Sequence, residues 1–373
     1  MKILIPTLEY PPQIGGIAQY IVKQIEHWPD RSDSFVVCAP IDNHTADFDK
    51  KNSWITYRLK FYFNFFWPRW LRLLWQVNKI IKKKKVDKIL VHHILPVGYI
   101  AYLNKKLRQI PYYLFFHGRD LGLAFSRKPY KAKLICHQAE KIIVNSQYIK
   151  DQLLNYLPEI KDKIVVVYPC PSLSNKNTDN KKLAEIKELI NPDHAPLLLT
   201  VARFVKRKGI DDSILAFKQI LTEFPQAIYL IIGHGEEHIH LQALIVKNSL
   251  VNNVKIFSVS RADLPYYYQL ADVFVLTPKE LPEGDVEGFG MVYLEASFFG
   301  LPIVATKTGG VPEAVLNGKT GLLAESGNIE QIGQAIIKLL ANKNYARQLG
   351  EQGKQRVEME FEWGRQMRII VDS

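Results

Sequence analysis

Short apolar runs alternate with amphipathic stretches of helical length along most of the chain. Short apolar runs are typical of strands buried on both faces of a sheet, and the stretches between them repeat apolar residues with a helical period. In the first half this pattern predicts strands at 2–6, 35–39, 88–92, 112–116, 141–145 and 164–168. It predicts helices at 17–28, 69–85, 97–108 and 147–156.

A polar stretch without apolar periodicity, 172–182, precedes a second series. Its predicted strands are 196–202, 227–233, 254–257, 272–276 and 302–305, and its predicted helices are 209–222, 239–249, 290–299 and 328–341. Strands that alternate with helices of this length indicate parallel, Rossmann-like sheets. We therefore predict an α/β protein with two domains, 1–172 and 183–354.

Composition agrees with two globular domains in a reducing compartment. The chain has 373 residues, of which 47% are apolar and 23% charged, and this length suits two cores better than one. The three cysteines, Cys38, Cys136 and Cys170, have no paired spacing, which argues against a disulfide framework or a zinc site. The N-terminal apolar run is too short for a signal peptide, and no segment has the length and apolarity of a spanning helix. The predicted location is the cytoplasm.

The excess positive charge lies entirely in the first half. Residues 1–170 hold 27 Lys and Arg against 13 Asp and Glu, whereas residues 171–373 hold 22 against 24. The stretch 58–88 alone contains ten basic residues and one acid, together with a group of aromatic residues between 61 and 75. This segment therefore differs in character from the rest of the chain.

Three interpretations of residues 61–85 are open. Pro68 suits the first position of a helix, after which apolar residues fall on one side and basic ones mostly on the other. A basic helix rich in Trp can lie in the headgroup layer of an anionic membrane, and we favour this interpretation. The alternative is a surface helix whose apolar stripe packs in the core. Binding to nucleic acid is not expected, because no nucleic-acid motif accompanies the composition.

The most informative motif is Glu287-Gly-Phe-Gly-Met-Val-Tyr-Leu-Glu295, which Gly300-Leu-Pro302 and Gly309-Gly310 follow. A helix starting near Gly290 would offer free backbone N–H groups and a positive dipole end, which suit a phosphate. The two carboxylates suit sugar hydroxyls on either side of it. The combination indicates a diphosphate flanked by two sugars, which is a nucleotide-sugar.

This motif resembles the E-x7-E motif of the retaining glycosyltransferases of family 4, which have the GT-B fold. Gly15-Gly16, His117-Gly118, and Arg203 with Lys208 stand in the family's order. The resemblance implies two Rossmann-like domains that face each other across a cleft, with the acceptor on the first and the donor on the second. It also implies that a C-terminal helix, here 355–373, returns to the first domain.

The resemblance assigns roles to individual residues. The catalytic set is His117 near the reacting carbon of the hexose, Glu287 on its hydroxyls, and Arg203 and Lys208 on the diphosphate. The donor-binding set is Gly15, Gly16, Gly233, Val259, Phe289, Gly290, Met291 and Glu295, the last on the ribose. No role falls to Lys206, Arg207, His92 or His93, and Asp120 is predicted to cap the next helix.

The implied chemistry needs no divalent metal and no cofactor, because the nucleotide-sugar is a substrate. Cations and a helix end stabilise the leaving phosphate, which takes the proton of the acceptor while the hexose keeps its anomeric configuration. Asp47-Phe-Asp49 imitates a metal-binding motif but lies outside the cleft motifs, so we predict a loop there.

Three functions remain open from the sequence. The first is transfer of a hexose from GDP-mannose or a UDP-hexose to a membrane-associated glycan or lipid-linked acceptor, by a peripheral protein on the cytoplasmic face. The second is the same chemistry on a soluble acceptor. The third is a non-catalytic nucleotide-sugar binding protein. Residues 61–85 favour the first.

Overall fold

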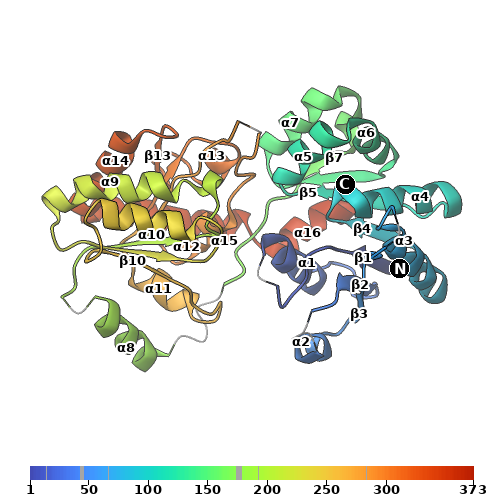
Figure 1. Ribbon diagram of the computed structural model, residues 1–373, viewed down its shortest axis with the longest axis horizontal. Coiled ribbons are helices and arrows are strands. Elements are labelled where there is room, and N and C mark those ends of the chain that lie inside the picture. Colours follow the sequence, from blue (N-terminus) through green and yellow to red (C-terminus); the bar gives the residue numbers. More distant parts are fainter. Residues whose placement is uncertain (14, 43–45, 66, 174–178, 192, 283) are drawn as a thin grey trace. The chain divides into compact units, whose positions relative to one another are not determined.

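The computed structural model describes every residue except 14, 43–45, 66, 174–178, 192 and 283. The described residues form two compact units, which we treat separately (Figure 1). Unit 1 comprises Met1–Pro169 together with Trp363–Ser373, and unit 2 comprises Cys170–Glu362.

Unit 1 is built on a seven-stranded parallel sheet in the order β3-β2-β1-β4-β5-β6-β7. The strands are β1 (Lys2–Pro6), β2 (Ser34–Pro40), β3 (Ile55–Leu59), β4 (Lys88–Val91), β5 (Tyr112–Phe116), β6 (Lys141–Val144) and β7 (Ile164–Val166). The strand order reverses between β1 and β4. Ligands of open α/β sheets bind at such a switch point, beyond the carboxyl ends of the strands.

Crossover helices flank this sheet, because parallel strands cannot be joined by tight turns. They are α1 (Gly16–Glu26), α2 (Ala46–Lys51), α3 (Leu71–Lys84), α4 (Tyr99–Arg108), α5 (Arg119–Arg127), α6 (Pro129–Gln138), α7 (Gln147–Tyr156) and the returning α16 (Trp363–Asp372), with single turns η1 (Ile94–Gly98) and η2 (Pro158–Lys163).

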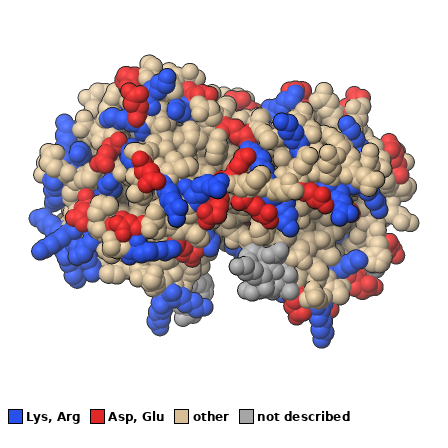
Figure 2. All heavy atoms as spheres, turned by 180° about the vertical axis from the view of Figure 1, so that it is seen from behind, with Lys and Arg blue, Asp and Glu red and all other residues tan. Residues whose placement is uncertain are grey.

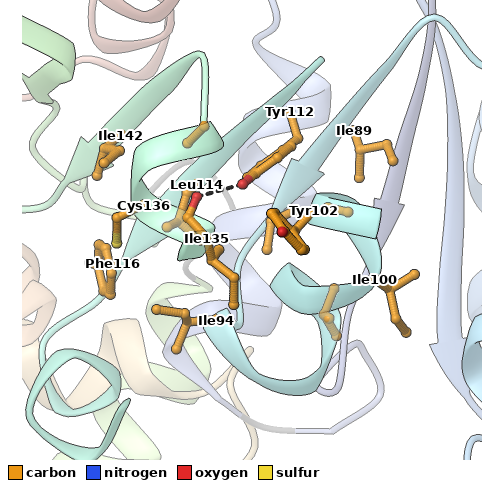
Figure 3. Close-up of a cluster of buried hydrophobic side chains, with 14 of the residues drawn as sticks. Ile89, Ile94, Ile100, Tyr102, Tyr112, Leu114, Phe116, Ile135, Cys136 and Ile142 are labelled. Atoms are coloured by element: carbon orange, nitrogen blue, oxygen red, sulfur yellow. Dashed lines mark hydrogen bonds between the residues drawn. The ribbon is translucent and has the colours of Figure 1, made fainter. Parts of the chain in front are cut away.

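The core of unit 1 lies between the sheet and these helices (Figure 3). Alternate residues of β5, among them Tyr112 and Leu114, point to one face of the sheet, where Tyr102 of α4 and Ile135 of α6 meet them. The hydroxyl of Tyr112 donates a hydrogen bond to the carbonyl of Ile135 at 2.5 Å. The buried Tyr therefore satisfies its polar end inside the core.

Unit 2 contains a six-stranded parallel sheet in the order β10-β9-β8-β11-β12-β13. Its strands are β8 (Leu197–Val201), β9 (Ile228–Ile232), β10 (Val254–Phe257), β11 (Val273–Leu276), β12 (Ile303–Thr306) and β13 (Gly321–Ala324). Its helices are α8 (Asn180–Ile190), α9 (Ile210–Glu223), α10 (His238–Lys247), α11 (Leu264–Leu270), α12 (Met291–Phe298), α13 (Val311–Ala314), α14 (Ile329–Ala341) and α15 (Lys343–Glu360), with the turn η3 (Lys206–Lys208). The switch point lies between β8 and β11.

Each strand and helix predicted in the two series is present, with ends shifted by two residues or fewer. The strands β3 and β13 were not predicted. β3 lies at the edge of its sheet and is half-exposed, so its sequence Ile-Thr-Tyr-Arg-Leu has no apolar run. β13 has only four residues. Asp49 lies in the short helix α2, so the loop predicted there is wrong.

Helix α3 corrects the interpretation of the basic, aromatic segment. It begins at Leu71, so Pro68 is not its first residue. Its apolar stripe, formed by Leu73, Val77, Ile80 and Ile81, is buried in the core of unit 1. The alternative, a surface helix whose apolar stripe packs in the core, is therefore confirmed for these four residues. They are not available to insert into a membrane.

Aromatic side chains around α3 nevertheless stay exposed. Phe65, Trp67 and Trp75 are 102%, 85% and 63% exposed. Figure 2 shows basic side chains gathered at the edge of unit 1 near which Figure 1 places α3 and α4. Among the described residues, no helix is long and apolar enough to cross a bilayer.

The C-terminal segment divides between the two units. Of the predicted return segment 355–373, residues 355–362 belong to unit 2 and only 363–373 to unit 1. Within unit 1, the ring of Trp363 packs edge-on against Tyr20 of α1 with centroids 5.3 Å apart. Lys141 donates to the carbonyl of Ile370 at 3.0 Å. These contacts tie α16 to the first sheet.

Candidate functional site

Polar side chains gather at the switch point of unit 1. Thr7 follows β1, His92 and His93 follow β4, and His117 follows β5. His93 Nε2 lies 3.1 Å from Thr7 Oγ1, and His92 Nδ1 lies 3.1 Å from His117 Nε2. The predicted position of His117 at the carboxyl end of its strand is confirmed, and the structure adds His92 as its direct neighbour.

The backbone of His117 is also held in place. Its N–H donates to Asp120 Oδ1 at 3.0 Å, and its carbonyl accepts from Asn145 Nδ2 at 3.1 Å. Burial lowers the pKa of His117 to about 3. The ring is therefore a fixed, neutral group at neutral pH.

Asp120 does not cap the next helix as predicted. Helix α5 begins at Arg119, so Asp120 lies inside its first turn, and its carboxylate reaches back to the N–H of His117. Its Oδ2 is buried and has no hydrogen-bond partner among the described residues. Burial raises the pKa of this carboxyl to about 7.

Gly15 and Gly16 stand at the start of α1, as predicted. The helix begins at Gly16, with Gly15 as the residue before it. A Cβ on Gly15 would lie 2.9 Å from Glu9 Oε2. The backbone at Gly15 therefore lies close to the carboxylate of Glu9, and a side chain at this position would collide with it.

In unit 2, an ion cluster lies at the switch point between β8 and β11. Glu287 Oε2 lies 2.5 Å from Lys208 Nζ and 2.6 Å from Arg207 Nη1. Arg207 Nε is also 3.3 Å from Asp285 Oδ1. Burial by itself would raise the pKa of Glu287, but the charges of Lys208 and Arg207 outweigh it and lower the pKa to about 2. Glu287 is thus an ionised acceptor.

The three predicted cluster residues differ in their placement. Lys208 and Glu287 are buried and paired. Arg203 is exposed, and no side-chain partner for it is found among the described residues. Arg207, which received no role from the sequence, belongs to the cluster instead. No sequence signal separates it from Lys206, because only the fold of η3 decides which of these side chains points inward.

Glu287 is followed by a turn that requires glycine. Gly290 has φ +94° and precedes α12, and a Cβ on it would lie 2.5 Å from the ring of Tyr293. The predicted helix start is confirmed. The N–H of Tyr293 already donates to the carbonyl of Gly290 at 3.1 Å. The N–H groups of Met291 and Val292 stand at the start of the helix, where no carbonyl within the helix can accept from them. Phe289, the preceding residue, is buried.

Glu295 lies within α12, about one turn from its start, and is also buried. Its Oε1 accepts from Ser172 Oγ at 3.2 Å and from Arg261 Nη2 at 3.3 Å, and its Oε2 is 3.4 Å from the hydroxyl of Tyr268. Burial raises its pKa. Arg261 was not predicted from the sequence, since it follows β10 without a recognisable pattern.

The remaining predicted residues line the carboxyl ends of β9 and β10. Gly233 has φ +153°, and a Cβ on it would lie 1.9 Å from the carbonyl oxygen of Ala202. Its turn therefore packs directly on the loop that leads to Arg203. Ser258 Oγ donates to the carbonyl of Gly233 at 2.8 Å, and Val259 beside it is half-exposed.

A metal site is not evident in the described part of the chain, where no three His, Cys, Asp or Glu side chains are grouped to hold an ion. Asp49, from the string that imitates a metal motif, instead forms an ion pair with Arg58 at 2.8 Å.

Comparison with known proteins gives two family matches. Residues 14–173 match the model described as Glycosyltransferase Family 4, and residues 181–356 match Glycosyl transferases group 1. The chain is 30% identical to an uncharacterized glycosyltransferase, MJ1178, of Methanocaldococcus jannaschii, with 97% of this chain and 95% of that protein covered.

Two further similarities concern a second relative and a solved structure. The chain is 28% identical to the GDP-mannose-dependent monoacylated alpha-(1-6)-phosphatidylinositol monomannoside mannosyltransferase of Corynebacterium glutamicum, over 100% of this chain and 98% of that protein. The crystal structure of Anabaena Alr3699/HepE in complex with UDP-glucose matches with a TM-score of 0.83 at 19% identity, over 100% and 99% of the two chains.

Proposed function

Since the chain belongs to glycosyltransferase family 4, we propose that it transfers a hexose from a nucleotide-diphosphate sugar, with retention of configuration, to a hydroxyl of a membrane-associated acceptor. The observation that supports this most directly is the cluster of Lys208, Arg207 and Glu287 beside the start of α12. It combines fixed positive charge with an ionised carboxylate at the switch point of a sheet.

The diphosphate is assigned to the cations after β8 and to the N–H groups of α12. Lys208 and Arg203 neutralise the phosphates, and Arg207 adds to the positive field. Gly290 allows the chain to turn so that the first N–H groups of α12 are available to an oxyanion. Because the cluster is held by buried ion pairs, its charges do not have to be reorganised when the substrate arrives.

Glu287 is assigned to the hydroxyls of the hexose. Its Oε2 is occupied by the two cations, and no partner for Oε1 is found among the described residues. An ionised oxygen accepts hydroxyl protons well. Glu295 is assigned to the ribose, which would replace part of its present contacts with Ser172 and Arg261. His117 of unit 1 is assigned to the hexose as well.

In the proposed transfer, one bond of the anomeric carbon breaks and another forms. The bond between the anomeric carbon and the leaving phosphate oxygen breaks, and the acceptor oxygen bonds to the same face of that carbon. The acceptor's proton passes to the leaving phosphate. Lys208, Arg203 and the N–H groups of α12 stabilise the charge that develops on it.

GDP-mannose is the preferred donor candidate for two reasons. The relative with 28% identity is named as GDP-mannose-dependent, and the string Asp285-Val-Glu-Gly-Phe-Gly290 resembles that of phosphatidylinositol mannosyltransferases. UDP-glucose is the second candidate, since a structure of the same fold contains it.

The membrane-associated acceptor is supported by the exposed aromatic residues around α3 and by the positive charge of unit 1.

A thermal-shift panel tests the donor site. GDP-mannose, UDP-glucose, GDP and UDP are added separately to the full-length protein. A ligand present at a hundredfold its Kd stabilises the folded state by about 2.7 kcal/mol. We expect one nucleotide series to raise the Tm, and Glu295→Ala to abolish that shift. An absence of any shift in this panel would contradict the proposed donor.

A further inference from the structure

His92 connects helix α1 to the end of β5 through two hydrogen bonds. Its ring is fully buried, as is Gln24 of α1. Its Nε2 lies 2.9 Å from Gln24 Oε1, and its Nδ1 lies 3.1 Å from His117 Nε2. The three side chains thus form one line that ends at a residue of the proposed site.

The positions of the protons follow from this line. The atom of Gln24 that faces His92 is the amide oxygen, which only accepts, so with this amide orientation His92 Nε2 donates to it. The amide nitrogen of Gln24 is buried without a partner among the described residues. A neutral imidazole carries one proton, so His92 Nδ1 accepts, and His117 Nε2 is its donor. The same reasoning leaves Nδ1 of His117 without a proton. No partner for this nitrogen is found among the described residues.

Both rings lie in surroundings that keep them neutral. Phe115 stacks on His92 with ring centroids 4.3 Å apart. The ring of Tyr20 is tilted against His92 at 5.8 Å and lies edge-on to His117 at 5.2 Å. Burial lowers the pKa of His92 well below its ordinary value, as it does for His117. An imidazolium, which would remove the acceptor nitrogen, is therefore disfavoured.

We propose that Gln24 and His92 are positioning residues that hold His117 in its Nε2–H tautomer, so that its Nδ1 accepts a hydrogen bond from a hydroxyl of the transferred sugar. This inference rests on the proposed function, which assigns His117 to the hexose. A nitrogen that only accepts selects a sugar with a hydroxyl at that position over one with fluorine or hydrogen there.

Nuclear magnetic resonance of the ligand-free, full-length protein labelled with 15N-histidine reads the tautomers directly. The variants His117→Asn and His92→Phe identify the two rings in two-bond 1H–15N spectra. We expect both rings in the Nε2–H form, without change between pH 6 and 8. A proton on Nδ1 of His117, or double protonation of either ring in this range, would overturn the inference.

Two substitutions of Gln24 separate positioning from packing. Gln24→Met has a similar shape but no acceptor oxygen, so His117 should populate both tautomers. As a result, kcat/KM for GDP-mannose or UDP-glucose should fall roughly ten- to a hundredfold, the range seen when a partner that orients a metal-bound histidine is removed. Gln24→Glu retains an oxygen acceptor and should keep both the tautomer and the rate. Equal loss in the two variants, or an unchanged tautomer in Gln24→Met, would count against the proposal.

Asn104→Leu is the matched control, because it removes a similarly buried amide from α4 whose partners are Ile100 and Arg108. It should lower the Tm without changing the His117 signals or kcat/KM. If the wild-type protein shows the Nε2–H pattern but no transfer, the proposed function fails while the positioning of His117 is supported.

Discussion

Four cations follow β8, and burial distinguishes them at the scale of single residues. Arg203 and Lys206 are exposed, Arg207 is partly buried, and Lys208 is buried. Of these four described residues, Arg207 and Lys208 contact Glu287. An unsolvated charge interacts more strongly with a phosphate than an exposed one does. The four residues should therefore contribute unequally to catalysis.

The variant Lys208→Met should lower kcat/KM roughly a hundred- to a thousandfold, the range for one lost charge-stabilising donor. It should also lower the Tm, because Glu287 keeps a buried charge with one cation fewer. Lys206→Met is the matched control on the same turn and should change neither quantity. The kcat/KM values of the two variants and the wild type are measured by steady-state kinetics at a temperature well below their melting temperatures. Equal losses in the two variants would refute the distinction.

Asp120 gives a pH-dependent prediction of stability. Its folded pKa of about 7 lies above its ordinary value of 3.8, so folding favours the protonated form. The stability from this group is complete below pH 4 and is lost as the pH rises through 7. Asp120→Asn keeps an oxygen that can accept from His117 N–H and cannot ionise. It should match the wild type at pH 4 and exceed it by about 2 to 4 kcal/mol at pH 8.

Urea unfolding of both proteins at pH 4, 6 and 8 measures this difference. If the free energy of unfolding of Asp120→Asn falls below that of the wild type as the pH rises, the burial of an unpartnered carboxyl oxygen is the wrong explanation.

At the scale of elements, α12 depends on the conformation of the residue before it. Gly290 combines a positive φ with a close approach to the ring of Tyr293, whereas Gly318 has φ +72° and nothing within 4 Å of its Cβ position. The two glycines therefore separate backbone strain from steric clash. This distinction matters because α12 also contains Glu295 and lies next to Glu287.

Gly290→Ala should destabilise unit 2 by more than about 2 kcal/mol, since strain and clash add. It should also weaken the thermal shift from the donor. Gly318→Ala should cost only the strain of about 1 kcal/mol and leave the donor shift intact. Urea unfolding and the thermal-shift panel measure both. A Gly290→Ala protein with normal donor binding would show that the start of α12 is not part of the site.

Elements were predictable where a buried strand or a two-sided helix produces a clear period. Tyr112–Phe116 and Val254–Phe257 are examples, and their ends agree with the structure. The apolar pattern did not predict strand β3, because a half-exposed edge strand needs no apolar run. It also misplaced the start of α3, since aromatic residues continue the apolar pattern before the helix begins at Leu71.

At the scale of the whole molecule, positive charge is concentrated in one unit. Residues 1–170 account for the excess of basic residues. Exposed Phe65, Trp67 and Trp75 lie in the same unit, and the basic residues 82–85 end α3. An anionic membrane attracts such a surface electrostatically, and aromatic side chains anchor in its headgroup layer.

Co-sedimentation with anionic and zwitterionic vesicles tests this surface. We expect binding to anionic vesicles that weakens as salt rises, because each Lys or Arg near the surface contributes about 1 kcal/mol at physiological ionic strength. The triple variant Phe65→Ser, Trp67→Ser, Trp75→Ser should bind weakly. The control Tyr130→Ser changes an aromatic residue of α6 that is 74% exposed, and it should bind like the wild type. Equal binding by both variants would reject this surface.

The sequence by itself determined the class of fold, the order of most elements and the positions of His117, Lys208, Glu287 and Glu295 on them. It could do so because strand burial, helix period and the glycine turns act over a few neighbouring residues. Tertiary structure alone decided that Arg207 rather than Lys206 pairs with Glu287, that Arg261 reaches Glu295 and that Gln24 and His92 align with His117. These contacts join residues 25 to 80 positions apart in the chain, and only the packing of the sheet and its helices brings such residues together.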